Sequence, residues 1–252
     1  KIPAQWFDAV LLERKEKPSQ IYSPLGKEAQ VLREVTSEGH PCILKLEDAL
    51  DASGDDPPCL VLEFCMGGSL ADVLGESERL DPLTAALIVV QIADALALLH
   101  RKGYAHGDVK PENILFTRDG VPKLADFNSA RAIAAASRSR VPLTPGYAAP
   151  EAVDTGRPSQ KGDVWSLALV LLEAVTGKAL FTSADFIRYQ EELQAFREGR
   201  VEVPRTGDDR LDEIIRRCLK VKPEERPTME EFERMLIEYL VEREYSASRK
   251  RG

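Results

Sequence analysis

Two long apolar stretches dominate the pattern of hydrophobic and polar positions along the chain. Residues 81–102 form a helical pattern that is apolar on nearly every face, and residues 164–175 are almost all apolar. A helix that is apolar all round is buried. Gln91 and Asp94 interrupt the first stretch and Glu173 the second. We therefore expect two buried helices, whose longest apolar stretches, residues 85–99 and 167–175, are too short and too interrupted to span a bilayer.

The first third of the chain has shorter apolar runs and one amphipathic helix. The runs predict strands at residues 6–12, 42–48 and 59–64. A helix is expected at about residues 25–34, directly after Ser23 and Pro24, which are residue types that begin helices.

Glu28 lies on the apolar face of this helix, together with Val31, Leu32 and Val35 at helical spacing. A carboxylate on an apolar face requires a partner. The alternative is that Glu28 only favours the start of the helix through its charge and is solvated. The pattern alone leaves both interpretations open.

A tight turn at residues 117–120 separates two short apolar runs, 114–116 and 122–125, which predict a β-hairpin. Polar side chains flank the open end of this hairpin. Before the first strand, an irregular loop with a proline carries Asp108, Lys110 and Asn113, and Asp126 follows the second strand. We expect these four side chains to converge.

This set of groups is suited to phosphoryl transfer. An acid can orient a hydroxyl, a lysine can balance phosphate charge, and an asparagine with a second acid can hold hard metal ions. Solvated turn residues are the alternative interpretation, and the ordered motifs further along the chain argue against it.

The run H-G-D-V-K-P-E-N, residues 106–113, resembles the catalytic loop of eukaryotic-type protein kinases, and D-F-N, residues 126–128, resembles their Asp-Phe-Gly motif. The resemblance implies ATP and Mg²⁺ as cofactors and protein hydroxyls as substrates. It implies that Asp108 orients the hydroxyl, that Lys110 steadies the phosphoryl group, and that Asn113 and Asp126 hold Mg²⁺.

T-P-G-Y-A-A-P-E, residues 144–151, extends the resemblance to the end of a kinase activation segment, here residues 129–143. It implies that Thr144 hydrogen-bonds Asp108 and Lys110, and with Lys110 it points to Ser/Thr rather than Tyr kinases. Ser137 and Ser139 in this segment are either phosphorylation sites or residues of a solvated loop.

L-E-F-C-M-G-G-S-L, residues 62–70, resembles a kinase hinge. It implies that Leu62 is the gatekeeper, that Glu63 and Cys65 offer backbone groups to adenine, and that Leu115 contacts the nucleotide. An ordinary strand-to-helix turn would be marked equally well by Gly-Gly-Ser.

Four departures from the family pattern bear on activity. Leu11 stands in the register of the lysine that pairs with the glutamate corresponding to Glu28, and no glycine-rich loop precedes it. Gly107 replaces the arginine that binds an activation-loop phosphate in many kinases, so that switch is not expected. Asn128 replaces a glycine and is expected to tolerate positive φ. A pseudokinase, acting as a nucleotide-binding or nucleotide-free scaffold, is therefore the alternative to an active Ser/Thr kinase.

The rest of the chain resembles the kinase scaffold. Glu151 and Arg226 match a buried ion pair of the family, and Asp163 is expected to cap the helix that follows and to accept hydrogen bonds from the catalytic-loop backbone. His106, Phe127 and Leu32 would stack into a column between the lobes. A terminal amphipathic helix is expected at residues 229–244, followed by a frayed tail.

The expected fold is α+β: a bilobal kinase fold with a β-rich N-lobe at about residues 1–64, a hinge at 63–68 and a helical C-lobe at 69–244. With 252 residues, 43% of them hydrophobic, the chain can bury a large core. Its net charge of −8 argues against a nucleic-acid partner.

Four cysteines without C-x-x-C spacing predict free thiols in a reducing compartment, and no signal peptide is visible. We expect a cytoplasmic protein. Secretion stays open, because the sequence can begin inside a longer chain.

Overall fold

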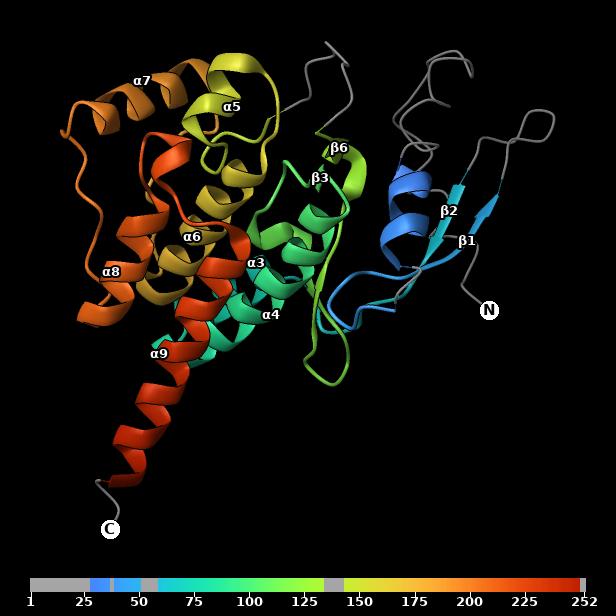
Figure 1. Cartoon of the computed structure of the whole chain (residues 1–252), viewed down its shortest axis with the longest axis horizontal. Coiled ribbons are helices and arrows are strands. Elements are labelled where there is room, and N and C mark those ends of the chain that lie inside the picture. The colour runs from blue at the N-terminus through green and yellow to red at the C-terminus, as the bar shows by residue number, and fades with distance from the viewer. Residues whose placement is uncertain (1–27, 37–38, 51–58, 134–142, 250–252) are drawn as a thin grey trace.

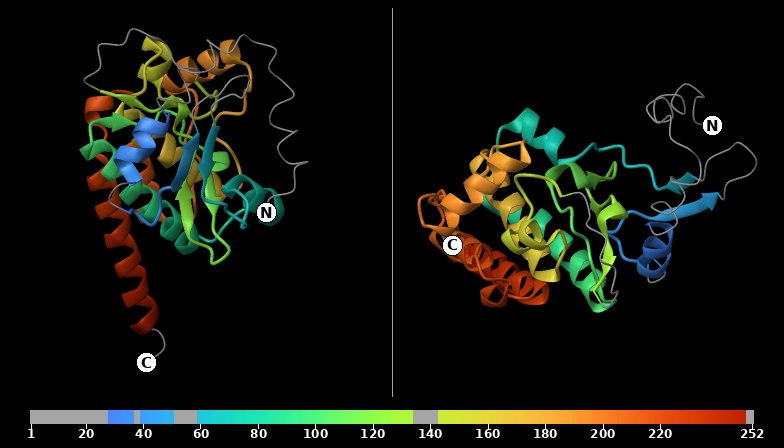
Figure 2. Two further views of the ribbon diagram at one scale, coloured as in Figure 1. Left: turned by 90° about the vertical axis from the view of Figure 1, so that its right-hand side faces the viewer. Right: turned by 90° about the horizontal axis from the view of Figure 1, so that it is seen from above.

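The computed structural model describes residues 28–36, 39–50, 59–133 and 143–249 of the chain (Figure 1). Helices α3 to α9 gather in one part, and the N-terminal strands with the helix at residues 28–36 form the other. Seen from above in Figure 2, the N-terminal strands lie at the opposite end of the molecule from α8 and α9. This division confirms the α+β fold expected from the sequence.

Helix α6 (Gln160–Thr176) is the buried axis of the helical part. It packs against α4 (Pro82–Arg101), α8 (Asp209–Cys218) and α9 (Met229–Arg249). Because three helices surround it, residues on all its sides are apolar, and its residues 163–172 are all buried.

The start of α6 differs from the sequence prediction. Ser159, not Asp163, caps the helix, and its hydroxyl accepts the N–H of Gly162 at 2.8 Å. Ser159 has the extended backbone that an N-cap residue adopts. Asp163 lies one turn inside the helix, so its carboxylate is free to serve the loop described below.

Helix α4 begins where expected, with the Asp81 carboxylate accepting the N–H groups of Leu83 and Thr84 at 3.0 and 3.1 Å. With 20 residues, it is the one helix among the described residues that is long and apolar enough to cross a membrane. The helix extends beyond residues 85–99, the apolar stretch that was judged too short to span a bilayer. Its apolar character is that of a core helix, because it packs against α6 and α9.

Three two-stranded antiparallel sheets are present in the described part of the chain. They pair β1 (Leu46–Leu50) with β2 (Cys59–Leu62), β3 (Tyr104–Ala105) with β6 (Arg131–Ala132), and β4 (Ile114–Phe116) with β5 (Pro122–Leu124). The last pair is the predicted hairpin, with the predicted turn between its strands.

The strand predicted at residues 42–48 begins later, at Leu46. The preceding residues pair with β5 instead: Leu124 donates to the carbonyl of Cys42 at 2.8 Å, and Leu44 donates to the carbonyl of Leu124 at 2.9 Å. The segment therefore connects the catalytic hairpin to the N-terminal part rather than extending β1.

The helix at residues 28–36 buries the face that its periodicity predicts, with Val31, Leu32 and Val35 inside. Some predictions fall outside the described residues: the strand at residues 6–12 with Leu11, and the serines at positions 137 and 139.

The remaining helices complete the helical part. They are α3 (Leu70–Ser77), α5 (Pro150–Thr155), α7 (Phe186–Arg197) and the short 3₁₀ turns η1 (Pro111–Asn113), η2 (Phe127–Ser129) and η3 (Pro223–Glu225). Helix α9 continues to Arg249 instead of ending at residue 244, because no glycine or proline stands between these positions to stop it.

Candidate active site

Asp108 is the centre of a hydrogen-bonded network at the catalytic loop. Its Oδ1 accepts the hydroxyl of Thr144 at 2.5 Å, and its Oδ2 accepts Lys110 Nζ at 2.9 Å and Asn113 Nδ2 at 3.0 Å. Lys110 Nζ also donates to Thr144 Oγ1 at 3.0 Å. The structure thus brings together the four residues that the sequence assigned to catalysis.

The carboxylate of Asp163 fixes the backbone of this loop. Its Oδ2 accepts the N–H of His106 at 2.8 Å and its Oδ1 accepts the N–H of Gly107 at 2.9 Å. His100 Nε2 lies 2.7 Å from the same carboxylate. Because Asp163 is buried on the core helix α6, these hydrogen bonds anchor the loop to the core.

Gly107 occupies a conformation that requires glycine. Its φ is +80°, and a Cβ at this position would lie 2.6 Å from Cβ of Pro158. An arginine side chain in this backbone would therefore be strained and would clash.

Asp126 follows β5 and lies beside Asn113. The N–H of Ala125 donates to the carbonyl of Asn113 at 2.9 Å, which joins the two segments immediately before Asp126. Asp126 has a left-handed backbone with φ 61°, whereas positive φ was expected at Asn128. Aspartate tolerates this region, and Asn128 instead continues into the 3₁₀ turn η2.

Asn113 and Asp126 offer a donor set that suits Mg²⁺. Because Asn113 donates its amide nitrogen to Asp108, its Oδ1 remains as an acceptor. Asp126 uses one oxygen for a long contact of 3.3 Å with the N–H of Asn128 and keeps the other. Mg²⁺ is commonly held by one or two protein oxygens together with substrate phosphates and water, so these two residues fit the ion.

His106 and Phe127, two members of the column predicted with Leu32, contact each other. Their rings meet edge to face with centroids 5.0 Å apart, and all three side chains are buried. His106 Nδ1 accepts the N–H of Asp108 at 3.3 Å, and its Nε2 lies 3.1 Å from the carbonyl of Ala125, to which it must donate. The histidine is therefore held as the neutral Nε2–H tautomer.

Glu28 is buried, with 6% of its surface exposed, so the solvated interpretation was wrong. Burial raises the pKa of its carboxyl, the nearby Asp126 raises it further, and a hydrogen bond from the backbone of Phe127 lowers it. The helix at residues 28–36 therefore contacts the segment of Asp126 and Phe127 directly.

The hinge residues lie against the catalytic hairpin. Gly67 donates to the carbonyl of Phe116, and Phe116 donates to the carbonyl of Gly68, both at 2.8 Å. Leu115 lies in this hairpin and is half-buried. A Cβ on Gly67 would come within 2.8 Å of Phe116, so glycine permits the close approach.

Glu63 has a partner that the sequence analysis missed. Its carboxylate binds Lys123 Nζ at 2.8 Å and accepts the N–H of Lys45 at 3.3 Å. Its own N–H donates to the carbonyl of Lys45 at 2.9 Å. The signal in the sequence was a lysine between Pro122 and Leu124 on a buried strand, where an ion needs a partner.

Comparison with known proteins agrees with this geometry. The family described as protein kinase domain matches residues 10–236. The chain belongs to the protein kinase family.

Relatives of this kinase domain include serine/threonine-protein kinases from animals and bacteria. Unc-51 of Caenorhabditis elegans is 33% identical over 232 residues, which cover 86% of this chain and 26% of that protein. PkaA of Streptomyces coelicolor is 35% identical over 234 residues, covering 90% and 41%. The human ULK1 is 30% identical over 238 residues, covering 89% and 22%. The chain thus spans less than half the length of these relatives.

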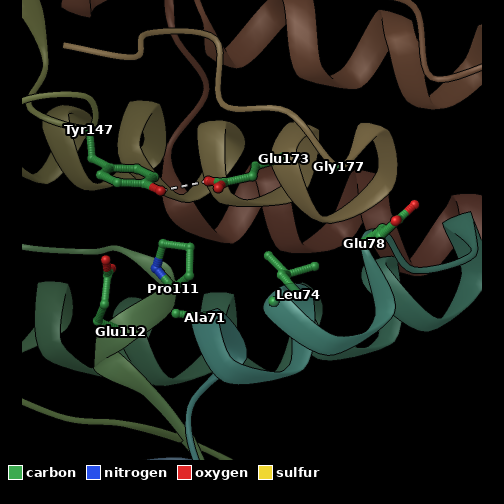
Figure 3. Close-up of a pocket in the computed structure, with 9 residues that line it drawn as sticks. Ala71, Leu74, Glu78, Pro111, Glu112, Tyr147, Glu173 and Gly177 are labelled. Carbon is green, nitrogen blue, oxygen red and sulfur yellow. Dashed lines mark hydrogen bonds between the residues drawn. The ribbon is translucent and has the colours of Figure 1, made fainter.

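A cavity of about 250 Å³ opens beside the catalytic loop of the kinase domain (Figure 3). It lies between the loop, α3 and α6, and its polar lining includes Glu112, Tyr147 and Glu173. Tyr147 donates to Glu173 at 2.5 Å, and burial raises the pKa of both groups. None of the residues that the sequence analysis assigned to nucleotide binding lines this cavity.

The buried ion pair predicted for the kinase scaffold is present. Arg226 binds both carboxylate oxygens of Glu151, at 2.9 and 2.8 Å. Its remaining donors reach the carbonyls of Lys161, Lys220 and Val221. Every nitrogen of this fully buried guanidinium has a partner, as a buried charge requires.

Proposed function

We propose that this domain is a Ser/Thr protein kinase that transfers the γ-phosphoryl group of ATP to hydroxyl groups of protein substrates. The observation that carries the proposal is the network in which Thr144, Lys110 and Asn113 all donate to Asp108, beside Asp126. A scaffold that performed no chemistry would have no physical need to keep these charged groups together.

Asp108 has the remaining acceptor capacity that the reaction needs. A carboxylate has about four acceptor positions, and Thr144, Lys110 and Asn113 fill three of them. A substrate hydroxyl would donate its proton to the fourth. As the bond between its oxygen and the γ-phosphorus forms, the bond from phosphorus to the ADP oxygen breaks, and Asp108 receives the proton.

Lys110 and Thr144 hold Asp108 in place during this step. Lys110 Nζ lies between the carboxylate and the threonine hydroxyl, where its charge also faces the transferring phosphoryl group. Mg²⁺, held by Asn113 and Asp126 when bound, would neutralise the phosphate charge. Tyrosine kinases usually carry an arginine at or near this position of the catalytic loop. The lysine at position 110 therefore supports serine and threonine as the acceptor residues.

The pseudokinase alternative rests on Leu11. With leucine in the register of the family lysine, one contact to the nucleotide phosphates is lost unless another residue supplies it. Glu28 remains beside Asp126 and Phe127, so the site keeps its acids and lacks a lysine at that position. In this case the domain would bind nucleotide weakly, or serve a partner protein as a scaffold.

Phosphate transfer from labelled ATP and Mg²⁺ distinguishes the two functions. Wild-type protein is expected to label itself and Ser/Thr peptides, and Asp108→Asn to lose the label by about 10²–10⁴-fold. Asp119→Asn, in the exposed hairpin turn, is the matched control and should equal the wild type. Equal labelling by wild type and Asp108→Asn, or none by either at high protein concentration, would reject the enzyme.

We also propose a reducing, cytoplasmic location. Support comes from the cysteines at positions 42, 59, 65 and 218, which are all free thiols. Maleimide labelling of the native protein from cells, with and without reductant, tests this: disulfides in the native protein would contradict it.

A further inference from the structure

A tyrosine joins the helix at residues 28–36 to the strand that leads into the catalytic loop. The hydroxyl of Tyr104 donates to the carboxylate of Glu34 at 2.6 Å, across 70 residues of sequence. Glu34 lies near the end of the helix, and Tyr104 is the first residue of β3. The contact therefore connects the N-terminal part of the domain to the helical part.

Tyr104 is rigidly connected to the catalytic residues. It pairs with Ala132 across the β3–β6 ladder, and the backbone of His106, two positions further along, is fixed by Asp163. The phenol hydroxyl consequently projects from a segment whose position is set by the core helix α6.

The other end of the same helix contacts the metal-binding segment. Glu28 receives a hydrogen bond from the backbone of Phe127 and lies beside Asp126. Glu28 and Glu34 are nearly two helical turns apart, about 9 Å along the axis. Because a helix turn moves as one body, a contact that fixes Glu34 also limits how far Glu28 can shift or rotate.

Apolar packing alone does not fix this helix in one position. Val31, Leu32 and Val35 are buried and hold the helix against the core, but hydrophobic contacts have no direction. A hydrogen bond does, and one to an ionised carboxylate is about twice as strong as a neutral one.

The protonation states favour a lasting bond. The hydrogen bond from Tyr104 lowers the pKa of Glu34, with help from Gln30 and the charge of Lys102. The same bond raises the pKa of Tyr104 to about 12. An ionised glutamate and a neutral phenol therefore persist through the physiological pH range.

We propose that Tyr104 is a positioning residue, which through Glu34 holds the helix at residues 28–36 so that Glu28 stays beside Asp126 and Phe127. The proposal deepens the kinase function proposed above and rests on it. In this chain Leu11 stands in the register of the family lysine that would pair with Glu28. The Tyr104–Glu34 contact instead restrains the helix from the helical part of the domain.

Two variants remove the contact in different ways. Tyr104→Phe deletes only the hydroxyl, and Glu34→Ala deletes the acceptor, whereas Glu34→Gln keeps an uncharged acceptor and should restore part of the effect. Gln30→Ala is the matched control, because it removes an exposed partner of Glu34 and leaves Tyr104 in place.

Hydrogen exchange and nucleotide kinetics give the readout. In Tyr104→Phe, amides at residues 31–36 should exchange about tenfold faster, the loss expected for one hydrogen bond to a charged group. The KM for ATP and Mg²⁺ should rise by a similar factor with kcat nearly unchanged, and the double variant with Glu34→Ala should add little.

Wild-type exchange and wild-type KM in both Tyr104→Phe and Glu34→Ala would overturn the proposal. If the wild type transfers no phosphate, the kinase function fails while the exchange measurement still decides the role of Tyr104. Nucleotide affinity, measured with ATP and Mg²⁺ by calorimetry, then replaces KM.

Discussion

Thr144 Oγ1 lies 2.5 Å from Asp108 Oδ1, although 36 residues separate the two along the chain. The hydroxyl is both a donor to Asp108 and an acceptor from Lys110. It therefore ties the segment that follows residue 143 to the catalytic loop. With Thr144 in place, the carboxylate and the ammonium, which also contact each other at 2.9 Å, are held in a fixed geometry.

Removing this hydroxyl should weaken phosphate transfer. Thr144→Val keeps the shape but removes the donor to Asp108 Oδ1 and one of the two acceptors of Lys110 Nζ, so we expect transfer to fall about 10- to 100-fold. Thr144→Ser retains the hydroxyl and should stay within a few-fold of wild type. Steady-state labelling measures both, and a valine variant as active as the serine variant would contradict the role of the bond.

Alanine at Gly107 should cost more stability than alanine at Gly103. Both glycines have φ near +80°, so each substitution costs ~1–2 kcal/mol for the left-handed backbone. Gly103 has open space around its Cβ position, whereas at Gly107 Pro158 is 2.6 Å away. Overpacking should add ~1–3 kcal/mol there.

Urea unfolding of the two variants separates these contributions. Pro158→Gly in the Gly107→Ala background should recover part of the added cost, because it removes the clashing Cβ. Equal destabilisation by the two alanines would mean that the loop shifts freely and that Pro158 does not confine it.

Breaking the buried ion pair should destabilise the helical part strongly. Arg226→Met leaves Glu151 without its partner and removes donors from three carbonyls, so the free energy of unfolding should fall by ~3–5 kcal/mol. Arg200→Met removes an exposed pair with Glu198 and should change it by less than ~1 kcal/mol. Thermal or urea unfolding tests the contrast, and comparable losses would refute it.

His106 should make the fold less stable in mild acid. Burial lowers the pKa of His106 in the folded protein, while the unfolded chain keeps an ordinary value of about 6.5. Below that value the unfolded state binds a proton that the folded state does not, so stability falls as pH falls. Protonation would also displace the N–H of Asp108 from Nδ1.

His106→Phe tests this origin, since phenylalanine keeps the ring but cannot titrate. The free energy of unfolding of wild type should drop between pH 7 and 5 relative to that of the variant. A pH profile identical in the two proteins would assign the acid sensitivity to other groups.

The catalytic residues were predictable because they are local in sequence. Asp108, Lys110 and Asn113 lie within one loop, and a hairpin of defined turn length brings Asp126 back to it. Both inferences use spacing over a few residues, where turn chemistry and strand periodicity determine the backbone.

Contacts between distant segments could not be predicted in the same way. The sequence placed Glu28 on the apolar face of its helix but left its burial open, because its surroundings come from Asp126 and Phe127, about a hundred positions away. The Tyr104–Glu34 bond likewise depends on how the two parts of the domain meet.

The observed ends of strands and helices differ from the predicted ends where contacts between distant segments competed with the local sequence pattern. Residues 42–44 are apolar like a strand of the N-terminal sheet, yet they bond to Leu124 in the hairpin. Asp163 has the chemistry of an N-cap, but Ser159 stands one turn earlier and takes that position.

The hairpin turn at residues 117–120 points to a place where the polypeptide can be altered without touching the chemistry. The spacing of Asn113 and Asp126 is set by the β4–β5 ladder and by the bond from Ala125 to Asn113, and Arg118, Asp119 and Gly120 are exposed. Doubling the length of a loop costs only about 0.6 kcal/mol. A reporter peptide or a small folded module inserted there would leave Asn113 and Asp126 in register, which makes this turn a natural point for building sensors into the domain.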